Sequence, residues 1–283
     1  VNRPIDFVHM PVIKSRTDDA FFALLEGLQL KPETELYLGL THYDDTAGES
    51  DGEKPLDAVR YFTRITQRLI AAFSAPTAEG ILYEVDMRLR PSGRAGPLAS
   101  RIDSFADYQE REAWTWEHMA LTRARVISSS PAFRKKIEDI IRSVLTRPRD
   151  PVNTAGDVAD MRRAIAQEKG EGDVWDLKYA AGGTVDIDFI AQYLQLVHAA
   201  DKPEILNVST SAVLDNAARL GMLAHSDAEV LRAAARLYYD LTQIIRLCVT
   251  GKFNPATSGE DLLRVMARAG DTPDFSTLEA RLR

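Results

Sequence analysis

The sequence contains a single cysteine, Cys248, and therefore cannot form a disulfide bond within the chain. Cys248 lies in an apolar pattern with helical spacing, so we expect a small hydrophobic residue of the core rather than a reactive thiol. A chain without disulfides is typical of a reducing compartment. These observations predict a cytoplasmic protein.

Long apolar stretches are also missing. No run of about eighteen apolar residues occurs, because charged residues interrupt every apolar stretch, and this excludes a typical membrane-spanning helix. The first twenty residues contain Pro, His, Lys, Arg and Asp in close succession. They lack the continuous apolar centre and the cleavage site of a secretory signal, and we expect none.

Positive charge is in short supply, with 35 Lys and Arg residues against 42 Asp and Glu residues and a formal net charge of −7. This balance excludes a general nucleic-acid binder, which needs a basic surface. The arginines are nevertheless clustered, with Arg88, Arg90 and Arg94 in one short segment and Arg123 and Arg125 in another. Clustered arginines in an acidic protein indicate a site for a small polyanion such as a nucleotide.

An acidic, glycine-containing segment at Asp44–Pro55 indicates a loop or linker that divides the chain unevenly. Before it, the pattern predicts a helix at Asp18–Leu28 and a short buried strand at Glu35–Leu40. About fifty residues bury little core on their own, so we expect this part to pack against another.

Helical spacing of apolar residues dominates the sequence after this loop. Ser226 and Glu229 form a predicted capping box, and Gly251 is a predicted C-terminal stop. We expect helices at Leu56–Phe73, Ser104–Ile127, Pro131–Leu145, Asn153–Lys169, from the Gly182-Gly183 turn to Ala199, and at Ser209–Leu220, Ser226–Thr250 and Gly259–Ala269.

The segment Ile81–Arg90 (ILYEVDMRLR) has a period of two and predicts a strand. Alternation puts Glu84, Asp86, Arg88 and Arg90 on the same face. One interpretation is an exposed edge strand with alternating charges. The other is an aspartate that binds a divalent cation beside arginines that bind phosphate, because magnesium prefers carboxylate oxygens and arginine matches phosphate with two hydrogen bonds.

Three motifs occur in order: YEVDMRLRPSGRAGPL (83–98), EAWTWEHMALTRARV (112–126) and DLKYAAGGTVDIDFIAQYLQL (176–196). Together they resemble the glutamine synthetase adenylyltransferase family, in a collinear match from about residue 50 to the C-terminus. The residues of these motifs are more similar to those of the C-terminal, adenylylating half of that family. The family in turn resembles nucleotidyltransferases of the DNA polymerase β type.

The resemblance implies an α+β fold that is predominantly helical. Residues 51–150 would form a truncated polymerase β-like nucleotidyltransferase core with few strands, and residues 151–283 an all-helical domain. It also implies an activity: AMP is transferred from ATP, with Mg²⁺, to a tyrosine of glutamine synthetase, and is removed again by phosphorolysis with ADP as product. Glutamine and the PII signalling protein would control the balance between the two reactions.

Within the first motif, the resemblance makes Asp86 the third catalytic carboxylate and a metal ligand, with Arg88 and Arg90 as phosphate contacts and Glu84 as a further candidate. The second motif adds Glu117, Arg123 and Arg125. Two residues apart on a regular helix, the two arginines would diverge by about 200° and could not both contact one ligand. An ion pair with Glu117 or another acid therefore remains an alternative to a nucleotide contact.

The third motif adds Lys178 as a nucleotide contact and two further candidates, Asp186 and Asp188. Asp188 stands where the family more usually has Glu. Gly182 and Gly183 are expected to make the tight turn into the next helix.

The family's first two carboxylates lie in a Gly-Ser-Asp-x-Asp signature after a Gly-Lys-Leu-Gly-Gly stretch, and this sequence contains neither. Asp44 and Asp45 are the nearest acids, but adjacent residues of a strand point to opposite faces. Two-metal phosphoryl transfer needs carboxylates that bridge both ions. We therefore predict that this polypeptide alone lacks a complete catalytic site. Two alternatives are a non-catalytic helical module that binds glutamine synthetase or PII, and a remnant of a fused gene.

Residues 1–48 do not resemble the adenylyltransferases and are weakly similar to a barrel protein related to cobalamin-independent methionine synthase. The expected boundary of this unrelated segment is residue 50. His9 and His42 would then be inherited site residues or, as we favour, surface histidines without a role.

Overall fold

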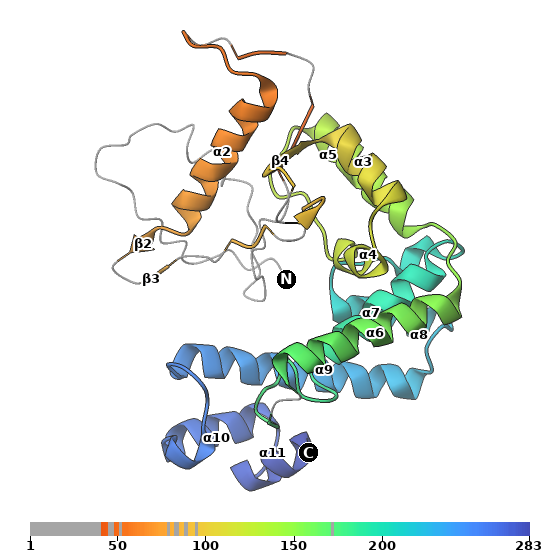
Figure 1. Ribbon diagram of the computed structural model, residues 1–283. Coiled ribbons are helices and arrows are strands. Elements are labelled where there is room, and N and C mark those ends of the chain that lie inside the picture. The colour runs from red at the N-terminus through yellow and green to blue at the C-terminus, as the bar shows by residue number, and fades with distance from the viewer. Residues whose placement is uncertain are drawn as a thin grey trace. The chain divides into compact units, whose positions relative to one another are not determined.

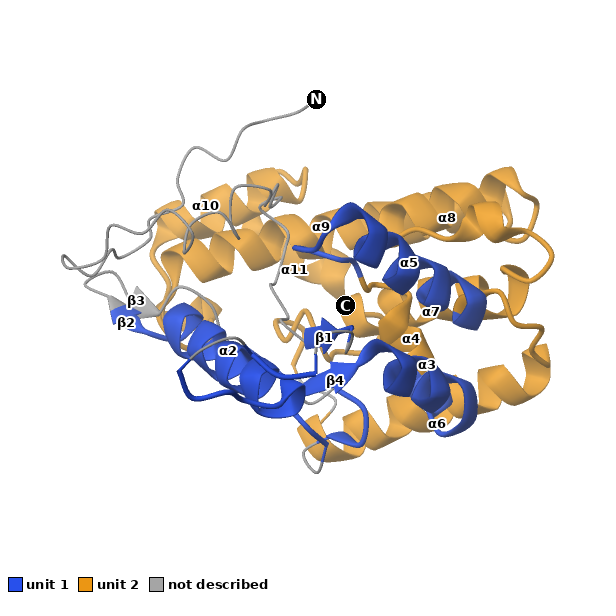
Figure 2. Cartoon of the chain, turned by 90° about the horizontal axis from the view of Figure 1, so that it is seen from above, with its two compact units in different colours: residues 1–117, 125–144 blue, residues 118–124, 145–283 orange. Residues whose placement is uncertain are grey.

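The computed structural model describes residues 41–44, 48–50, 53–77, 80–81, 85–87, 90–93, 96–170 and 173–283 (Figure 1). The chain divides into two compact units: unit 1 contains residues 1–117 and 125–144, and unit 2 contains residues 118–124 and 145–283 (Figure 2). Some predicted features lie outside the described residues, namely the helix Asp18–Leu28, the strand Glu35–Leu40, and His9, Asp45, Glu84, Arg88 and Arg94.

Short strands in unit 1 are organised around a helix. Strand β1 (Thr41–Tyr43) pairs in parallel with β4 (Ala99–Arg101), and α2 (Ala58–Phe73) lies between them in the sequence. Because parallel strands cannot be joined by a tight turn, the chain needs a crossover, to which α2 belongs. Strands β2 (Pro76–Thr77) and β3 (Gly80–Ile81) form a short antiparallel pair after α2.

The core of unit 1 lies where α2 and α3 (Ile102–Arg111) meet the parallel pair of strands. Ile102 and Phe105 are fully buried, and the ring of Tyr43 stacks on Phe62 of α2 with 4.6 Å between the ring centroids. Two helices follow at α4 (Thr115–Leu121) and α5 (Pro131–Leu145).

Unit 2 is helical throughout its described residues, apart from turns and connections. Its first complete helix is the long α6, and two 3₁₀ turns lie among the helices that follow. The elements are α6 (Pro151–Lys169), α7 (Thr184–His198), a 3₁₀ turn (Pro203–Ile205), α8 (Thr210–Arg219), α9 (His225–Cys248), a 3₁₀ turn (Pro255–Thr257), α10 (Glu260–Ala269) and α11 (Phe275–Leu282).

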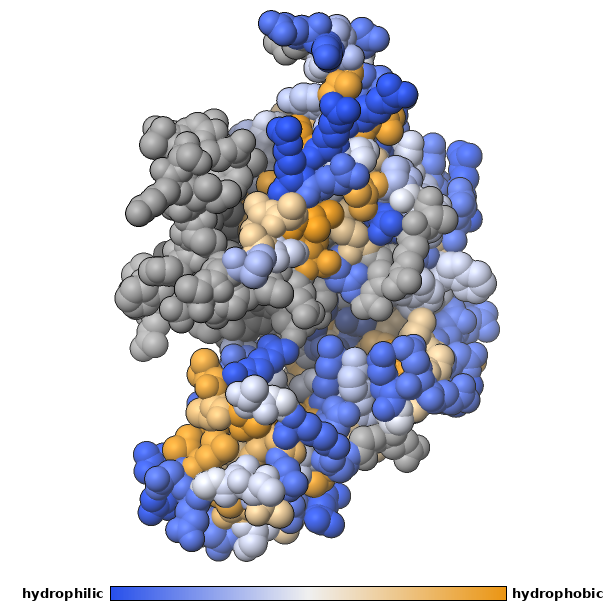
Figure 3. All heavy atoms as spheres, turned by 60° about the vertical axis from the view of Figure 1, so that its left-hand side comes forward, coloured by the Kyte–Doolittle hydropathy of each residue, from blue (hydrophilic) through white to orange (hydrophobic). Residues whose placement is uncertain are grey.

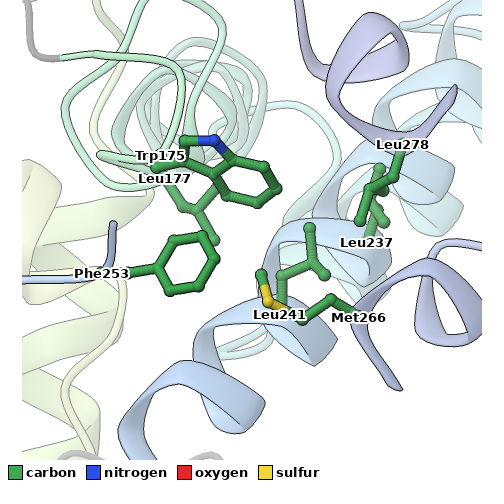
Figure 4. Packing of buried hydrophobic residues seen from close by; sticks show 7 residues of the cluster. All are labelled: Trp175, Leu177, Leu237, Leu241, Phe253, Met266 and Leu278. Atoms are coloured by element: carbon green, nitrogen blue, oxygen red, sulfur yellow. The ribbon is translucent and has the colours of Figure 1, made fainter. Parts of the chain in front are cut away.

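Two hydrophobic clusters hold unit 2 together. One joins α7, α8 and the first 3₁₀ turn through Ala191, Leu194, Ile205 and Val213. The other lies around α9, α10 and α11, where Trp175 and Phe253 come from connecting segments and lie beside helix residues (Figure 4). The helix residues of this cluster are Leu237, Leu241, Met266 and Leu278. Trp175 stacks on Phe275 with 5.0 Å between the ring centroids.

The predicted fold class, α+β and predominantly helical, is confirmed, because most described residues are helical and their strands form only two two-stranded sheets. Several helix boundaries differ from the prediction. The predicted helix Ser104–Ile127 is two helices, α3 and α4. The predicted capping box at Ser226 is wrong, because α9 begins at His225 after Ala224, which makes no side-chain cap, and α11 was not predicted.

Most of the predicted strand Ile81–Arg90 is not a strand in its described part. Among these residues only Ile81 lies in a strand, and Val85–Met87 pair with no neighbour that the structure describes. The carbonyl of Met87 instead accepts hydrogen bonds from the backbone N–H of Arg90, at 3.3 Å, and from its guanidinium. The chain therefore turns where an extended strand was expected.

Two single-residue expectations are also wrong. Cys248 is exposed, although Ile245 in the same last turn of α9 packs against the core around Leu241. His42 is not a surface residue, because its ring lies against Phe105 with 4.3 Å between the centroids and both ring nitrogens are buried.

Apolar residues are also present at the surface. The exposed fraction is 70% for Trp114, 78% for Val152 and 84% for Leu247, and Figure 3 shows hydrophobic residues among hydrophilic ones on the face turned forward. Within the described part of the chain, no helix combines the length and the apolar character needed to cross a membrane.

Candidate functional site

The first motif forms a turn that its own arginine holds in place. Arg90 is half-buried and donates hydrogen bonds from Nη1 to the carbonyl of Met87 at 2.6 Å and from Nε to the carbonyl of Gly96 at 3.0 Å. A side chain at Gly96 would put its Cβ 1.9 Å from the carbonyl oxygen of Pro91, so only glycine fits there. Arg90, predicted as a phosphate contact, thus donates some of its N–H groups to backbone carbonyls instead.

Asp86, the predicted metal ligand, is half-buried just before this turn. Glu84 and Arg88, its predicted neighbours on the same face, lie outside the described residues. Asp44 is exposed and forms an ion pair with Lys136 at 3.6 Å. Within the described ranges, no three His, Cys, Asp or Glu side chains come together as a metal site would require. These residues alone do not fit a two-metal centre.

Glu117 is buried and is satisfied by two neighbours within unit 1. Its Oε1 accepts a hydrogen bond from the hydroxyl of Tyr108 at 2.8 Å, and its Oε2 accepts one from the backbone N–H of Trp114 at 2.9 Å. The second contact is the glutamate half of a capping box, which starts α4. Burial raises the pKa of Tyr108, and the hydrogen bond to Glu117 raises it further. The carboxylate therefore fixes the junction between α3 and α4.

The two arginines of the second motif have different surroundings. Nη1 of Arg123 lies 2.7 Å from Oδ2 of Asp188, whose Oδ1 accepts a hydrogen bond from the hydroxyl of Thr210 at 2.5 Å. Arg123 therefore forms the kind of ion pair left open above, with Asp188 instead of Glu117. Arg125 is exposed and makes no ion pair with any residue that the structure describes.

Asp186 belongs to a second arginine–carboxylate pair, with Arg162 of α6. Nε of Arg162 contacts Oδ1 of Asp186, and Nη2 lies 3.2 Å from Oδ2 and 3.0 Å from the carbonyl of Tyr179. Oδ2 also accepts a hydrogen bond from the backbone N–H of Gly182 at 2.7 Å. Arg162 thus ties α6 to the turn before α7. The sequence could not single out Arg162, because Arg163 stands beside it and only the fold decides which one faces α7.

Lys178 is exposed on the turn that Arg162 and Asp186 hold. Its Nζ lies 5.4 Å from the centre of the Tyr179 ring, and its carbonyl accepts a hydrogen bond from the backbone N–H of Val185. The predicted turn at the two glycines is present. A Cβ at Gly183 would lie 2.8 Å from two carbonyl oxygens, and Gly182 has a positive φ of 76°.

Family comparisons match two parts of the chain. Residues 35–140 match the family of the glutamate-ammonia ligase adenylyltransferase, and residues 159–257 match that of the GlnD PII-uridylyltransferase. Both are families of nucleotidyltransferases. Most of the described chain is therefore related to enzymes of this class.

Comparisons with individual curated proteins identify the kind of enzyme more specifically than the two family matches. A bifunctional glutamine synthetase adenylyltransferase/adenylyl-removing enzyme of Rhodopseudomonas palustris (strain BisB5) is 73% identical over 241 residues, 85% of this chain and 24% of the relative. That of Bradyrhizobium sp. (strain BTAi1) is 71% identical over 244 residues, 86% of this chain and 25% of the relative. By sequence the chain belongs with the glutamine synthetase adenylyltransferases, and it spans about a quarter of the length of these relatives.

The similarity reaches further toward the N-terminus than the predicted start near residue 50. The adenylyltransferase family match begins at residue 35. The corresponding enzyme of Xanthobacter autotrophicus is 51% identical over 277 residues, which is 97% of this chain and 28% of the relative. An alignment of this extent includes most of residues 1–48.

Proposed function

We propose that this chain is a segment of an enzyme that attaches AMP from ATP to a tyrosine of glutamine synthetase and removes it again by phosphorolysis. The observation that carries the proposal is the identity of 73% over 241 residues with an enzyme named for both reactions. ATP and ADP are then the nucleotides, and glutamine and the PII protein the regulators. The proposed location is the cytoplasm.

The same proposal limits what the segment does alone. Mg²⁺ with ATP is the cofactor that the family implies, but Asp86 is the one candidate ligand of the first motif among the described residues, and no three possible ligands gather there. Glu117, Asp186 and Asp188 bind protein groups instead. These side chains cap a helix or connect one helix to another segment. We infer that the rest of the metal site must come from residues that this segment does not supply.

AMP transfer tests this proposal directly. The full chain is incubated with glutamine synthetase, magnesium and ATP labelled at the α-phosphate, beside a full-length relative as positive control. We expect labelled glutamine synthetase with the relative and none with this chain. Replacing the matching aspartate of the relative by asparagine should abolish transfer there. Transfer by this chain that disappears in Asp86→Asn would contradict the proposed incompleteness.

A second function, a non-catalytic module that binds glutamine synthetase or PII, is favoured by one observation. The carboxylates of Glu117, Asp186 and Asp188 all bind other groups of the protein. They therefore stabilise a helical scaffold, as a non-catalytic module requires. Immobilised chain should then retain glutamine synthetase or PII at micromolar concentrations. As a control, binding should be lost when the chain is unfolded with urea. If the immobilised chain retains neither glutamine synthetase nor PII, the module is rejected.

A further inference from the structure

The exposed face of α2 carries a stripe of arginines, of which only Arg60 pairs with an acid among the described residues. Arg60, Arg64 and Arg68 are all exposed and are four residues apart. At 100° and 1.5 Å per residue they lie within about 80° of one another around the helix and about 6 Å apart along it. Thr66, the buried residue of α2, lies about 160° around the helix from Arg64. We call these three residues the arginine stripe.

Few acids of the described chain balance the arginine stripe. Helix α2 contains no Asp or Glu, and its N-cap residue Asp57 contacts Arg60 alone, at 3.3 Å between Oδ2 and Nε. Arg64 and Arg68 form no ion pair or hydrogen bond with a residue that the structure describes. The stripe therefore holds positive charge that is largely unbalanced within the described residues, in a chain whose net charge is −7.

The arrangement is unfavourable for the helix itself. Like charges four residues apart repel each other on a helix surface. Arg60 also lies in the first turn, where the helix dipole favours negative charge, and α2 has neither an acid in its first turn nor a base in its last. Among the described residues, only Asp57 offsets this repulsion, at one end of the stripe. A ligand that brings negative charge to all three arginines would remove it.

We propose that the arginine stripe is a docking surface for an acidic helix of a partner protein, with carboxylates at four-residue spacing. Side chains four apart on such a helix repeat every 6 Å or so, which is the spacing of the arginines. Tyr61, beside the stripe and 41% exposed, offers an aromatic contact of the kind that is enriched in protein interfaces. The net negative charge of the chain opposes a long polyanion such as a nucleic acid. This inference is independent of the proposed catalytic function.

Fluorescence anisotropy with a labelled peptide probe tests the proposal on the full chain. The probe is an alanine-based helical peptide with glutamate at every fourth position. A peptide of the same composition, with its glutamates spread over all faces, is the control probe. We expect the spaced peptide to bind about tenfold tighter than the control peptide, with an affinity that falls as salt is added.

Arg64→Glu is the informative variant, and Arg268→Glu, at an exposed arginine of α10, is its matched control. Arg64→Glu should weaken binding of the spaced peptide about fivefold to tenfold, and Arg268→Glu should leave it unchanged. Because the substituted glutamate would lie between Arg60 and Arg68, the melting temperature should stay constant or rise. A structural role of the stripe would instead lower it.

Two further probes test whether the arginine stripe binds a nucleic acid or a membrane surface instead of an acidic helix. A single-stranded oligonucleotide and vesicles of phosphatidylserine and phosphatidylcholine carry negative charge without the helical spacing. The proposal is overturned if either binds more tightly than the spaced peptide, if the two peptides bind equally or not at all, or if Arg64→Glu lowers the melting temperature.

Discussion

At the scale of single residues, His42 is the side chain whose environment differs most from what its sequence position indicates. Neither ring nitrogen makes a hydrogen bond within the usual distance and angle limits, although the backbone of Ser100 is close enough to affect the ring. Burial lowers the pKa of His42 from 6.5 to about 4, and Ser100 opposes this shift in part. The ring is therefore held neutral inside unit 1 at neutral pH.

This environment predicts that acid weakens unit 1 through His42. The unfolded histidine takes up a proton near pH 6.5 and the folded one only near pH 4, so stability falls as the pH falls through this window. The loss reaches about 3 kcal/mol at most, because each pKa unit corresponds to about 1.4 kcal/mol. In His42→Leu, urea unfolding at about pH 7 and about pH 4.5 should show a smaller loss than in the parent chain. An unchanged loss would contradict the prediction.

At the scale of elements, apolar periodicity predicts helices well where the chain supplies clear start and stop signals. Helix α5 has the predicted bounds, Pro131–Leu145, and α6 begins two residues earlier than predicted, at Pro151. The break between α3 and α4 contains no proline or glycine. Instead, the contact of Glu117 with the backbone N–H of Trp114 starts the new helix there. That contact is the glutamate half of a capping box, but the sequence signal is incomplete because Trp114 stands where a Ser or Thr would complete the motif.

Helix α11 could have been found from the sequence. Asp274 caps it by accepting a hydrogen bond from the backbone N–H of Thr277 at 2.7 Å, and Leu278 and Leu282 follow with helical spacing. The partners of the candidate site residues could not, because Arg123–Asp188 and Arg162–Asp186 join residues far apart in the sequence. Periodicity finds elements, whereas such pairs follow from how the elements pack.

Two glycines predict opposite effects of the same substitution. Gly183, at the start of α7, has two carbonyl oxygens 2.8 Å from the position of a Cβ, so Gly183→Ala should destabilise unit 2 by about 1–3 kcal/mol. Gly156, inside α6, has open space at that position, so Gly156→Ala should stabilise the chain by about 0.5–1 kcal/mol. Thermal unfolding measures both. An unchanged or higher melting temperature for Gly183→Ala would show that the turn before α7 relaxes without cost.

At the scale of the whole molecule, the tryptophans report on the two units separately. The sequence has three, of which Trp114 and Trp116 belong to unit 1 and are 70% and 36% exposed. Trp175 belongs to unit 2, is 8% exposed, and contacts the rings of both Phe253 and Phe275. A chain with both unit 1 tryptophans replaced by phenylalanine would carry one buried probe in the core of unit 2.

In such a Trp114→Phe, Trp116→Phe chain, we expect the fluorescence of Trp175 to follow the unfolding of unit 2 with little dependence on pH between about 6.5 and 4.5. The paired carboxyl of Asp173 supports this, because its hydrogen bond from Lys252 lowers its pKa below 3.8. Its contribution is thus present above that value and is lost only in stronger acid. Protection factors for amide hydrogen exchange in β1, β4 and α3, which are corrected for the slower intrinsic exchange in acid, should fall as the pH is lowered over the same range, because His42 acts on unit 1. If acid instead lowers the unfolding free energy that Trp175 reports as much as the opening free energies of unit 1, the two units unfold as one.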